Sequence, residues 1–254
     1  MGAPLPGASQ GKGHFANRRV DSVKNGCSFS ANNKWVRQAS QLRSQIIVDD
    51  ALQNLKAELA RFGQVNDATQ TERPHRMLNI TRDTGEFLAV LVRATAAQRV
   101  LEIGTSNGYS TLWLAEAAKG IGGSVTTVEF AEYKARLAAA NFARSGLSPF
   151  VTLVRDDARH VLERSGPNAY DLIFLDAERP EYPGWWPELR RVLRPGGLLI
   201  VDNASTHVEQ MAPFVALVTA DIEFATCLVP VGNGAFLAVK NASPDGCPTI
   251  AWRT

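Results

Sequence analysis

From residue 99 to residue 240 the chain alternates short aliphatic runs with amphipathic stretches, and this alternation most restricts the folds it can adopt. Runs such as RVLEI at 99–103 and YDLIFL at 170–175 have the length and composition of buried strands. Strands that alternate with helices build βαβ units, whose parallel strands form one sheet covered by helices on both faces. The sequence therefore predicts an α/β fold.

The predicted elements follow one another with short connections. We expect strands at 99–103, 124–129, 150–154, 170–175, 198–201, 222–229 and 235–240, and helices at 109–119, 131–144, 158–164, 182–193 and 208–219. Gly232-Asn233-Gly234 predicts a hairpin between the last two strands, which adds an antiparallel strand at one side. Helical spacing also predicts a helix at 41–62 closed by Gly63, a loop at 63–80, and a helix at 84–96 with Thr81 as its N-cap.

The first 40 residues differ from the rest of the chain. Residues 1–48 hold seven of the 27 basic residues and one of the 25 acidic residues, so the other 206 residues carry 20 basic and 24 acidic side chains. We expect residues 1–40 to be a disordered leader, because such a composition buries little apolar surface; a transit peptide and an RNA-touching arm are the alternatives. We expect residues 41–254 to form a single domain, with the helices of 41–97 capping its site.

Composition argues against several classes of protein. The net charge of +2 is too small to indicate nucleic acid by itself. The cysteines Cys27, Cys227 and Cys247 are odd in number and lack metal-ligand spacing, which argues against a disulfide framework or a zinc site. No run approaches the ~18 apolar residues of a membrane span, and the first 40 residues lack the apolar core of a secretory signal. We therefore expect a cytoplasmic protein without membrane contact.

The turn after the first predicted strand carries the main functional signal. It reads Gly104-Thr105-Ser106-Asn107-Gly108, preceded by Glu102, and so departs from the G-x-G-x-x-G turn that holds a dinucleotide pyrophosphate. An acid at 102 repels phosphate but can accept hydrogen bonds from an ammonium group. Glu129 ends the second strand, where a carboxylate can bind both hydroxyls of a ribose. These features predict S-adenosylmethionine as the ligand and disfavour an NAD-dependent dehydrogenase.

Several further sequence segments, taken with this turn, resemble those of a known family. LEIGTSNGYSTLWLA, TTVE, RDDA, YDLIFLDAERPEY and LRPGGLLIVDN occur in order between about residues 77 and 240. This part resembles the class I S-adenosylmethionine-dependent methyltransferases, and more narrowly the metal-dependent catechol and caffeoyl-CoA type O-methyltransferases. The resemblance implies a Rossmann-like, seven-stranded, mostly parallel sheet with an antiparallel last strand. Together with the turn, it gives as cofactor-binding residues Met77, Asn79, Glu102, Gly104, Thr105, Ser106, Gly108, Ser110, Glu129, Asp157, Ala158 and Asp176.

Polar residues also follow two later strands. Asp176 comes after YDLIFL, and Asp202 and Asn203 come after LLIV. Ligands of open α/β sheets bind at the carboxyl ends of strands, so we expect these three side chains to meet. An all-oxygen set suits Mg²⁺ best, with Mn²⁺ or Ca²⁺ as alternatives, and three protein ligands leave room for water and substrate. A divalent cation would lower the pKa of a bound phenol and orient two adjacent oxygens.

One residue departs from the family. Where the family has a lysine base, three residues after the first acid, this chain has Arg179. Arginine stays protonated and is a poor base. Three explanations stay open: Arg179 stabilises an oxyanion already ionised by the metal, Glu178 or His207 takes the proton, or the acceptor differs from a catechol. The predicted catalytic residues are therefore Asp176, Arg179 and His207.

The favoured function is methylation of a catechol-like or other small vicinal-diol acceptor by a homodimer. A tRNA hydroxyuridine O-methyltransferase is the first alternative, which the acidic body disfavours, and a cofactor-binding protein without turnover is the second. Trp185 or Trp186 could wall the acceptor pocket, although ordinary packing is the preferred interpretation. We expect Cys227 to be a core residue and His160 to be solvated.

Overall fold

A computed structural model describes residues 34–242, with side chains from residue 50 onward. Most of the predicted leader, including Cys27, lies outside these residues, as does Cys247. The chain divides into two compact units, residues 1–45 and 46–254, and the second unit holds the sheet. No helix within 34–242 combines the length and the apolar character that crossing a membrane requires.

The sheet has seven strands in the order β3-β2-β1-β4-β5-β7-β6. β7 pairs antiparallel with β5 and β6, while the pairs among β1 to β5 are parallel. The predicted α/β class and the antiparallel last strand are therefore confirmed. The strands are β1 (Arg99–Ile103), β2 (Ser124–Glu129), β3 (Val151–Arg155), β4 (Tyr170–Leu175), β5 (Leu193–Val201), β6 (Phe224–Val229) and β7 (Ala235–Lys240).

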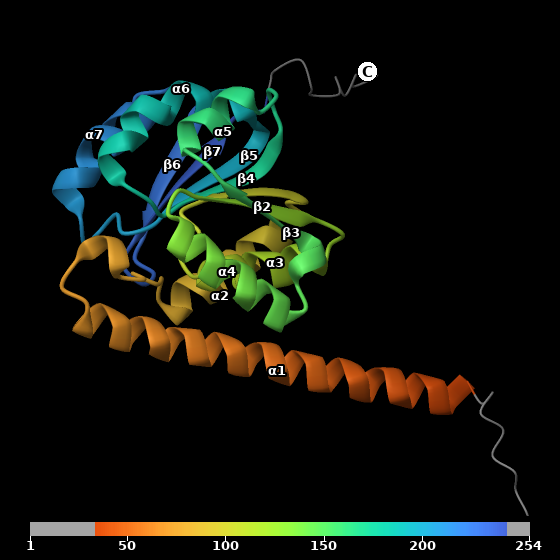
Figure 1. The fold of residues 1–254 in the computed structure, drawn as a ribbon. Helices are drawn as coiled ribbons and strands as arrows, with labels where there is room; N and C mark the ends of the chain where they lie inside the picture. Colours follow the sequence, from red (N-terminus) through yellow and green to blue (C-terminus); the bar gives the residue numbers. More distant parts are fainter. Residues whose placement is uncertain (1–33, 243–254) are drawn as a thin grey trace, which may run out of the picture. The chain divides into compact units, whose positions relative to one another are not determined.

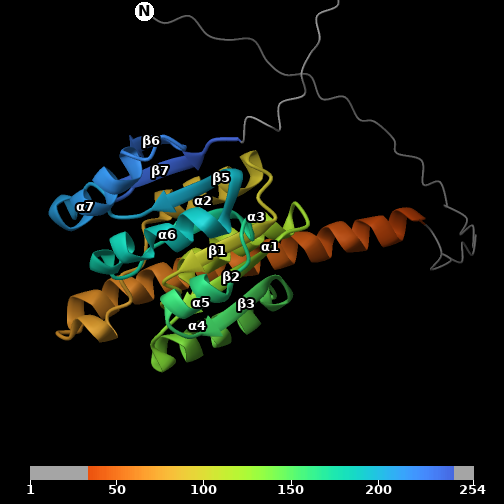
Figure 2. The ribbon, with the colours of Figure 1, turned by 90° about the horizontal axis from the view of Figure 1, so that it is seen from above.

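Helices cover both faces of the sheet (Figures 1 and 2). One apolar cluster joins the sheet to the second half of α1, to α2 and α3, and to Phe142 of α4; the other joins it to α5, α6 and α7. The central strands contribute to both clusters, which explains their nearly continuous aliphatic sequences. The helices are α1 (Lys34–Thr69), α2 (Arg82–Ala94), α3 (Tyr109–Lys119), α4 (Glu132–Ser145), α5 (Ala158–Arg164), α6 (Tyr182–Val192) and α7 (Val208–Thr219).

The prediction that Gly63 closes the first helix is wrong, because α1 continues to Thr69. A Cβ atom at residue 63 would lie 2.5 Å from Nδ2 of Asn79, so the glycine leaves room for that side chain. The predicted loop at 63–80 is correspondingly shorter and contains a 3₁₀ helix at Arg73–His75. The predicted N-cap is confirmed, since Oγ1 of Thr81 accepts a hydrogen bond from the backbone N–H of Thr84.

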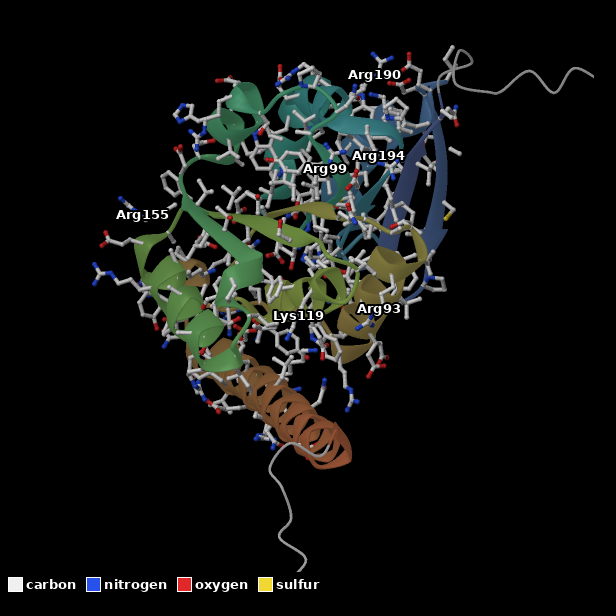
Figure 3. The ribbon with its side chains drawn as sticks, turned by 90° about the vertical axis from the view of Figure 1, so that its right-hand side faces the viewer. Arg93, Arg99, Lys119, Arg155, Arg190 and Arg194 are labelled. Atoms are coloured by element: carbon white, nitrogen blue, oxygen red, sulfur yellow. The ribbon has the colours of Figure 1, made fainter. Side chains whose placement is uncertain are left out.

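Asp171 of β4 joins the neighbouring strands β1 and β5 at the end of the sheet opposite to the glycine turn. Its carboxylate accepts hydrogen bonds from Arg99 (2.7 Å) at the start of β1 and from Arg194 (2.8 Å) in β5. Figure 3 shows these two arginines close together. It also accepts the backbone N–H groups of Gln98 and Arg99. Burial raises the pKa of Asp171, but these hydrogen bonds outweigh it and hold the pKa at about 2.

Three smaller predictions have clear outcomes. Cys227 is exposed rather than buried, because β6 is an edge strand and residue 227 points away from the helix that covers it. His160 is exposed on α5 as predicted, beside Asp156. Trp186 packs in the core against Phe214 and Phe224, so ordinary helix packing accounts for it.

Candidate functional site

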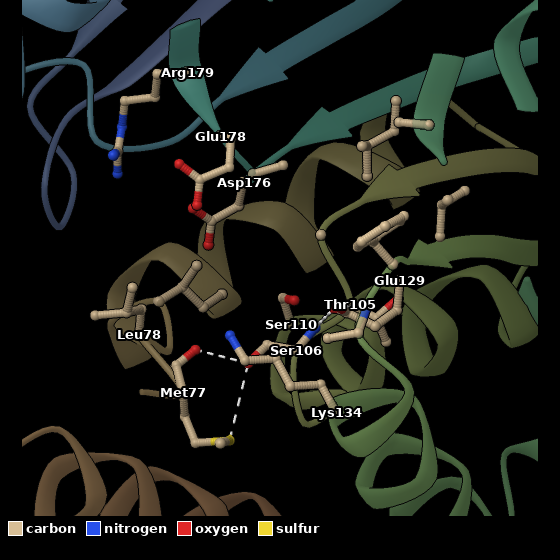
Figure 4. Close-up of a pocket in the computed structure, with 18 of the residues that line it drawn as sticks. Met77, Leu78, Thr105, Ser106, Ser110, Glu129, Lys134, Asp176, Glu178 and Arg179 are labelled. Carbon is tan, nitrogen blue, oxygen red and sulfur yellow. Dashed lines mark hydrogen bonds between the residues drawn. The ribbon is translucent and has the colours of Figure 1, made fainter. Parts of the chain in front are cut away.

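A cavity of about 760 Å³ opens at the carboxyl ends of β1, β2, β4 and β5. Open α/β sheets bind ligands at this edge, because the loops there leave the sheet in opposite directions. Figure 4 shows Glu129 and Ser106 on one side of the cavity and Asp176, Glu178 and Arg179 on the other. Thirteen of the sixteen predicted site residues line it: Met77, Asn79, Gly104, Thr105, Ser106, Ser110, Glu129, Asp157, Ala158, Asp176, Arg179, Asn203 and His207.

The glycine turn approaches the next loop at backbone distance. Gly104 has φ +104°, and a Cβ atom there would lie 2.0 Å from the backbone oxygen of Asp176. Only glycine fits this combination of positive φ and close contact. The backbone N–H of Asp176 donates to the oxygen of Ile103 (3.0 Å), so the two sides of the cavity are joined directly.

Glu129 is fixed by backbone donors. One carboxylate oxygen accepts the N–H of Ser106 (2.8 Å) and the other that of Ala131 (2.9 Å). Ser106 adopts φ 48°, and its hydroxyl donates to the carbonyl of Met77 (2.7 Å), which ties the segment before α2 to the turn. Each oxygen of Glu129 keeps a lone pair for a ligand, so the carboxylate is oriented before any ligand arrives.

Asn79 and Met77 line another wall of the cavity, and hydrogen bonds to α1 fix both residues. The Asn79 amide donates to the carbonyl of Leu59 (3.0 Å), which explains why Gly63 must leave space beside it. The N–H of Met77 donates to the carboxylate of Asp67 (2.8 Å). At the far end, Asp157 caps α5 by accepting the N–H of Arg159, and Ala158 begins that helix.

Three predicted residues lie behind the wall rather than on it: Glu102, Gly108 and Asp202. Glu102 has no exposed surface and accepts hydrogen bonds from the hydroxyls of Ser110, Thr111 and Thr127. Glu102 therefore presents no exposed oxygen to the cavity, and Ser110, which donates to it, lines the cavity instead. Burial raises the pKa of Glu102 to about 7, despite the three hydroxyl donors. Gly108 packs against Phe142 instead of lining the cavity.

The acids after β4 and β5 meet as predicted. Asn203 donates from Nδ2 to Asp176 (3.1 Å) and to Asp202 (3.1 Å), and so bridges the two carboxylates. Burial raises the pKa of Asp176 well above its usual value, and the charge of Asp202 raises it further. Burial likewise raises the pKa of Asp202. Two like charges held this close favour a shared proton or a bound cation.

The donor set fits a hard divalent cation. Asp202 is 2% exposed, and its Oδ1 atom has no hydrogen-bond partner. Carboxylate and amide oxygens are the ligands such cations prefer, and rotation of the Asn203 amide would add a third oxygen. No cluster of three or more His, Cys, Asp or Glu side chains within residues 34–242 could hold a metal, so any cation here depends on two carboxylates and an amide.

Arg179 is the main cation on this side of the cavity. It is 6% exposed, and its one hydrogen-bond partner among the described residues is Oε1 of Gln210 at 3.4 Å. His207 lines the cavity at the N-terminus of α7, with Nδ1 3.0 Å from the hydroxyl of Thr206. Burial lowers the pKa of His207, and the charges of Arg179 and Arg73 lower it further. His207 is therefore neutral at physiological pH.

Sequence reasoning missed several residues of the cavity. Lys134 in the first turn of α4 points into it, and its position five residues after Glu129 could have indicated this (Figure 4). Asn233, which the sequence gave only as part of a hairpin, donates to Oδ1 of Asn203 (3.3 Å). Trp185 and Trp186 both belong to the core cluster, and of the two only Trp185 also lines the cavity. The hydroxyl of Tyr182 fixes the loop after β4, because it accepts the backbone N–H of Ala177 (2.7 Å) and donates to the carbonyl oxygen of the same residue (3.1 Å).

These features together define a class of protein. A sheet with β7 antiparallel between β5 and β6, a glycine turn after β1 and a carboxylate at the end of β2 is the Rossmann-like fold of S-adenosylmethionine-dependent methyltransferases. The predicted Rossmann-like fold is thereby confirmed.

The chain belongs to the O-methyltransferase family, whose profile matches residues 54–241. A relative from Mycobacterium sp. (strain JLS) that carries the name of an O-methyltransferase is 31% identical over 175 residues, which is 64% of this chain and 79% of the relative. A solved structure from Klebsiella pneumoniae, also named for O-methyltransferase activity, has 30% identity and a TM-score of 0.63 over 76% of this chain and 90% of its own. The Bacillus cereus O-methyltransferase in complex with SAH has 27% identity and a TM-score of 0.62, covering 74% of this chain and 91% of its own.

Proposed function

We propose that this protein transfers the methyl group of S-adenosylmethionine to a hydroxyl of a catechol-like or other small vicinal-diol acceptor, with the help of a divalent cation, Mg²⁺ before Mn²⁺ or Ca²⁺. The observation that carries the proposal is the meeting of Asp176, Asp202 and Asn203 beside a cavity whose other side is the glycine turn. Family membership supports the reaction type, and the all-oxygen donor set supports the cation.

Each side of the cavity has its own task in this proposal. Glu129 accepts the ribose hydroxyls, the turn at Gly104 and Ser110 receives the methionine end, and Asp157 with Ala158 borders the adenine. Asp176, Asp202 and Asn203 hold the cation, which would acidify a bound hydroxyl and align two neighbouring oxygens. Trp185 lies against the acceptor ring. Because the methyl group moves directly between bound partners, orientation supplies much of the rate.

Proton transfer is the step for which this chain lacks the usual residue. Arg179 stays protonated and serves to stabilise the acceptor oxygen after it ionises. His207 is the neutral group nearest to this task, since its pKa is lowered and it lines the same side. A homodimer and a cytoplasmic location remain predictions.

The test is methyl transfer from labelled S-adenosylmethionine to a panel of catechols, measured with Mg²⁺ and with EDTA. We expect turnover that EDTA removes and that monohydroxy analogues of the same acceptors do not support. Turnover that persists in EDTA would exclude the cation. Cofactor binding without turnover on any hydroxyl acceptor would replace the proposal with a binding function.

A further inference from the structure

The acceptor side of the cavity contains a buried guanidinium that the proposed reaction does not use as a base. Arg179 begins the 3₁₀ helix that follows β4, and its side chain lies to one side of Asp176 and Glu178 (Figure 4) and donates to Gln210 of α7. A guanidinium carries five N–H donors, and within the described residues only one long bond to Gln210 uses them. A buried cation with unused donors that borders a cavity is suited to an anionic ligand.

The charges around Arg179 support this assignment. In the protein alone, the positive charge of Arg179 lowers the pKa of Asp176 and of Asp202, although no ion pair among the described residues joins Arg179 to either carboxylate. A divalent cation held by these carboxylates would balance both of them, and Arg179 would then have no anionic partner. Bound S-adenosylmethionine adds a sulfonium charge to the same cavity. An unpaired buried charge is costly, so the acceptor must bring the missing negative charge.

The remaining groups on this side do not offer that charge. His207 carries no negative charge, and Gln210 and Asn233 are amides. Glu178 and Glu181 are the other acids on this side, but their side chains are 72% and 56% exposed, and each lies beside another arginine, 3.8 Å from Arg73 and 3.6 Å from Arg159 respectively. Arg179 lies three residues after Asp176, and both line the cavity, so its unused donors border the side on which the proposed cation site lies.

We propose that Arg179 selects acceptors that carry an oxyanion next to the hydroxyl that is methylated. This inference rests on the proposed function and specifies its acceptor class. The oxyanion has two possible sources, a carboxylate adjacent to the diol or a neighbouring hydroxyl acidic enough to ionise at neutral pH. To a carboxylate the guanidinium donates two parallel N–H groups, which a lysine cannot do, and to an ionised hydroxyl it donates N–H groups that meet at the single oxygen.

The experiment compares matched acceptors at one pH near neutrality, with Mg²⁺ and S-adenosylmethionine. The carboxylate pair is 2,3-dihydroxybenzoate against 2,3-dihydroxybenzamide, and the acidic-hydroxyl pair is 4-nitrocatechol against catechol. We expect kcat/KM to favour the oxyanionic member of at least one pair by tenfold or more, and the preferred pair identifies the source. Arg179→Gln should reduce that preference to about twofold or less, chiefly by raising KM for the anion, whereas Arg179→Lys should keep part of it.

A binding measurement without chemistry accompanies the kinetics. Calorimetric titration of the same acceptors into protein with Mg²⁺ and S-adenosylhomocysteine should give the same preference, and Arg179→Gln should remove it. Arg159→Gln is the matched control, because Arg159 is a cation on α5 beside Glu181 that does not line the cavity. This control should keep the wild-type preference.

Three results would overturn the inference. They are equal or better use of the neutral acceptors by the wild type, an unchanged preference in Arg179→Gln, and an equal loss of preference in Arg159→Gln. The second would show that Arg179 only balances Asp176 and Asp202. Methyl transfer without charge preference refutes this inference alone, whereas no transfer to any hydroxyl acceptor refutes the proposed function.

Discussion

β4 has one aspartate as its second residue and is followed directly by another, and the two have opposite surroundings. Asp171 meets two arginines and two backbone N–H groups, which hold its pKa at about 2. Asp176, five residues later, faces Asp202, and burial raises its pKa. Hydrogen bonds within the protein satisfy the first carboxylate, whereas the second lacks enough partners of opposite charge. The comparison teaches that the two ends of one strand have different roles. Asp171 at the amino end stabilises the sheet, whereas Asp176 at the carboxyl end lacks balancing charges in the protein and is available for function.

The largest expected effect follows from removing the unmatched acid. Asp176→Ala should lower kcat/KM by a factor of about 10³ or more, because it removes the proposed cation ligand and the orientation of the acceptor. Its melting temperature should stay the same or rise, since the change relieves repulsion with Asp202. Radiolabelled methyl transfer and calorimetry measure the two effects. A stable variant with full activity would remove Asp176 from the reaction.

Replacing the other aspartate, Asp171, should lower the stability of the fold rather than the rate of the reaction. Asp171→Ala leaves Arg99 and Arg194 without their shared carboxylate and should cost about 2–3 kcal/mol of unfolding free energy. At temperatures where it is folded, its kcat should match that of the wild type. Urea unfolding and steady-state kinetics on the same preparation test both statements. A selective loss of kcat in a folded variant would break the comparison.

The pH dependence of the unfolding free energy tests the stabilising role of Asp171 further. The pKa of Asp171 is depressed in the folded protein from 3.8 to about 2, so its ionised form stabilises the fold above pH ~4. That contribution should disappear as the pH falls from ~4 to ~2, which amounts to about 2 kcal/mol. The unfolding free energies of wild type and Asp171→Ala should therefore converge over this range. Curves that stay parallel would show that Asp171 acts by packing alone.

The third effect concerns the cofactor side of the cavity, where Glu129 is held by Ser106 and Ala131. Glu129→Gln keeps the size of the side chain but weakens two predicted bonds to ribose hydroxyls. Hydrogen bonds to charged groups contribute about 1.5–3 kcal/mol, so the dissociation constant for S-adenosylmethionine should rise roughly 10- to 100-fold. Fluorescence titration measures it. Unchanged cofactor affinity would exclude Glu129 from the ribose site.

Local patterns explain how much of this structure could be predicted. Aliphatic runs determine the strands, and strands that end together bring Asp176, Asp202 and Asn203 to one edge. Contacts between residues that are distant in sequence leave no local pattern from which they could be predicted. Nothing in the helical pattern around Gly63 shows that Asn79 needs its space, and nothing near Glu102 shows that three hydroxyls surround it. The role of Asn233 likewise depends on a fold that brings the last hairpin against the loop after β5.

The smallest expected effect tests that last contact. Asn233 donates to Oδ1 of Asn203, and the backbone oxygens of Asn233 and Gly234 accept the N–H groups of Ser205 and Ala204. These bonds support Asn203 in its left-handed conformation, with φ 64°. Asn233→Ala keeps the backbone bonds and removes only the side-chain bond, which contributes about 0.5–1.5 kcal/mol.

We therefore expect Asn233→Ala to raise the half-saturating Mg²⁺ concentration two- to tenfold, while kcat at saturating Mg²⁺ changes little. Direct Mn²⁺ binding, followed by electron paramagnetic resonance, should weaken by the same factor. Asn168→Ala is a suitable control, because Asn168 lies at the opposite end of the sheet, where its carbonyl accepts a hydrogen bond from Arg99, one of the two arginines that bind Asp171. An Asn233→Ala variant with normal cation affinity but a lower kcat would mean that Asn233 contacts the acceptor, which it can also reach because it lines the cavity. In that case Asn203 alone would join Asp176, at the carboxyl end of β4, to Asp202, at the carboxyl end of β5.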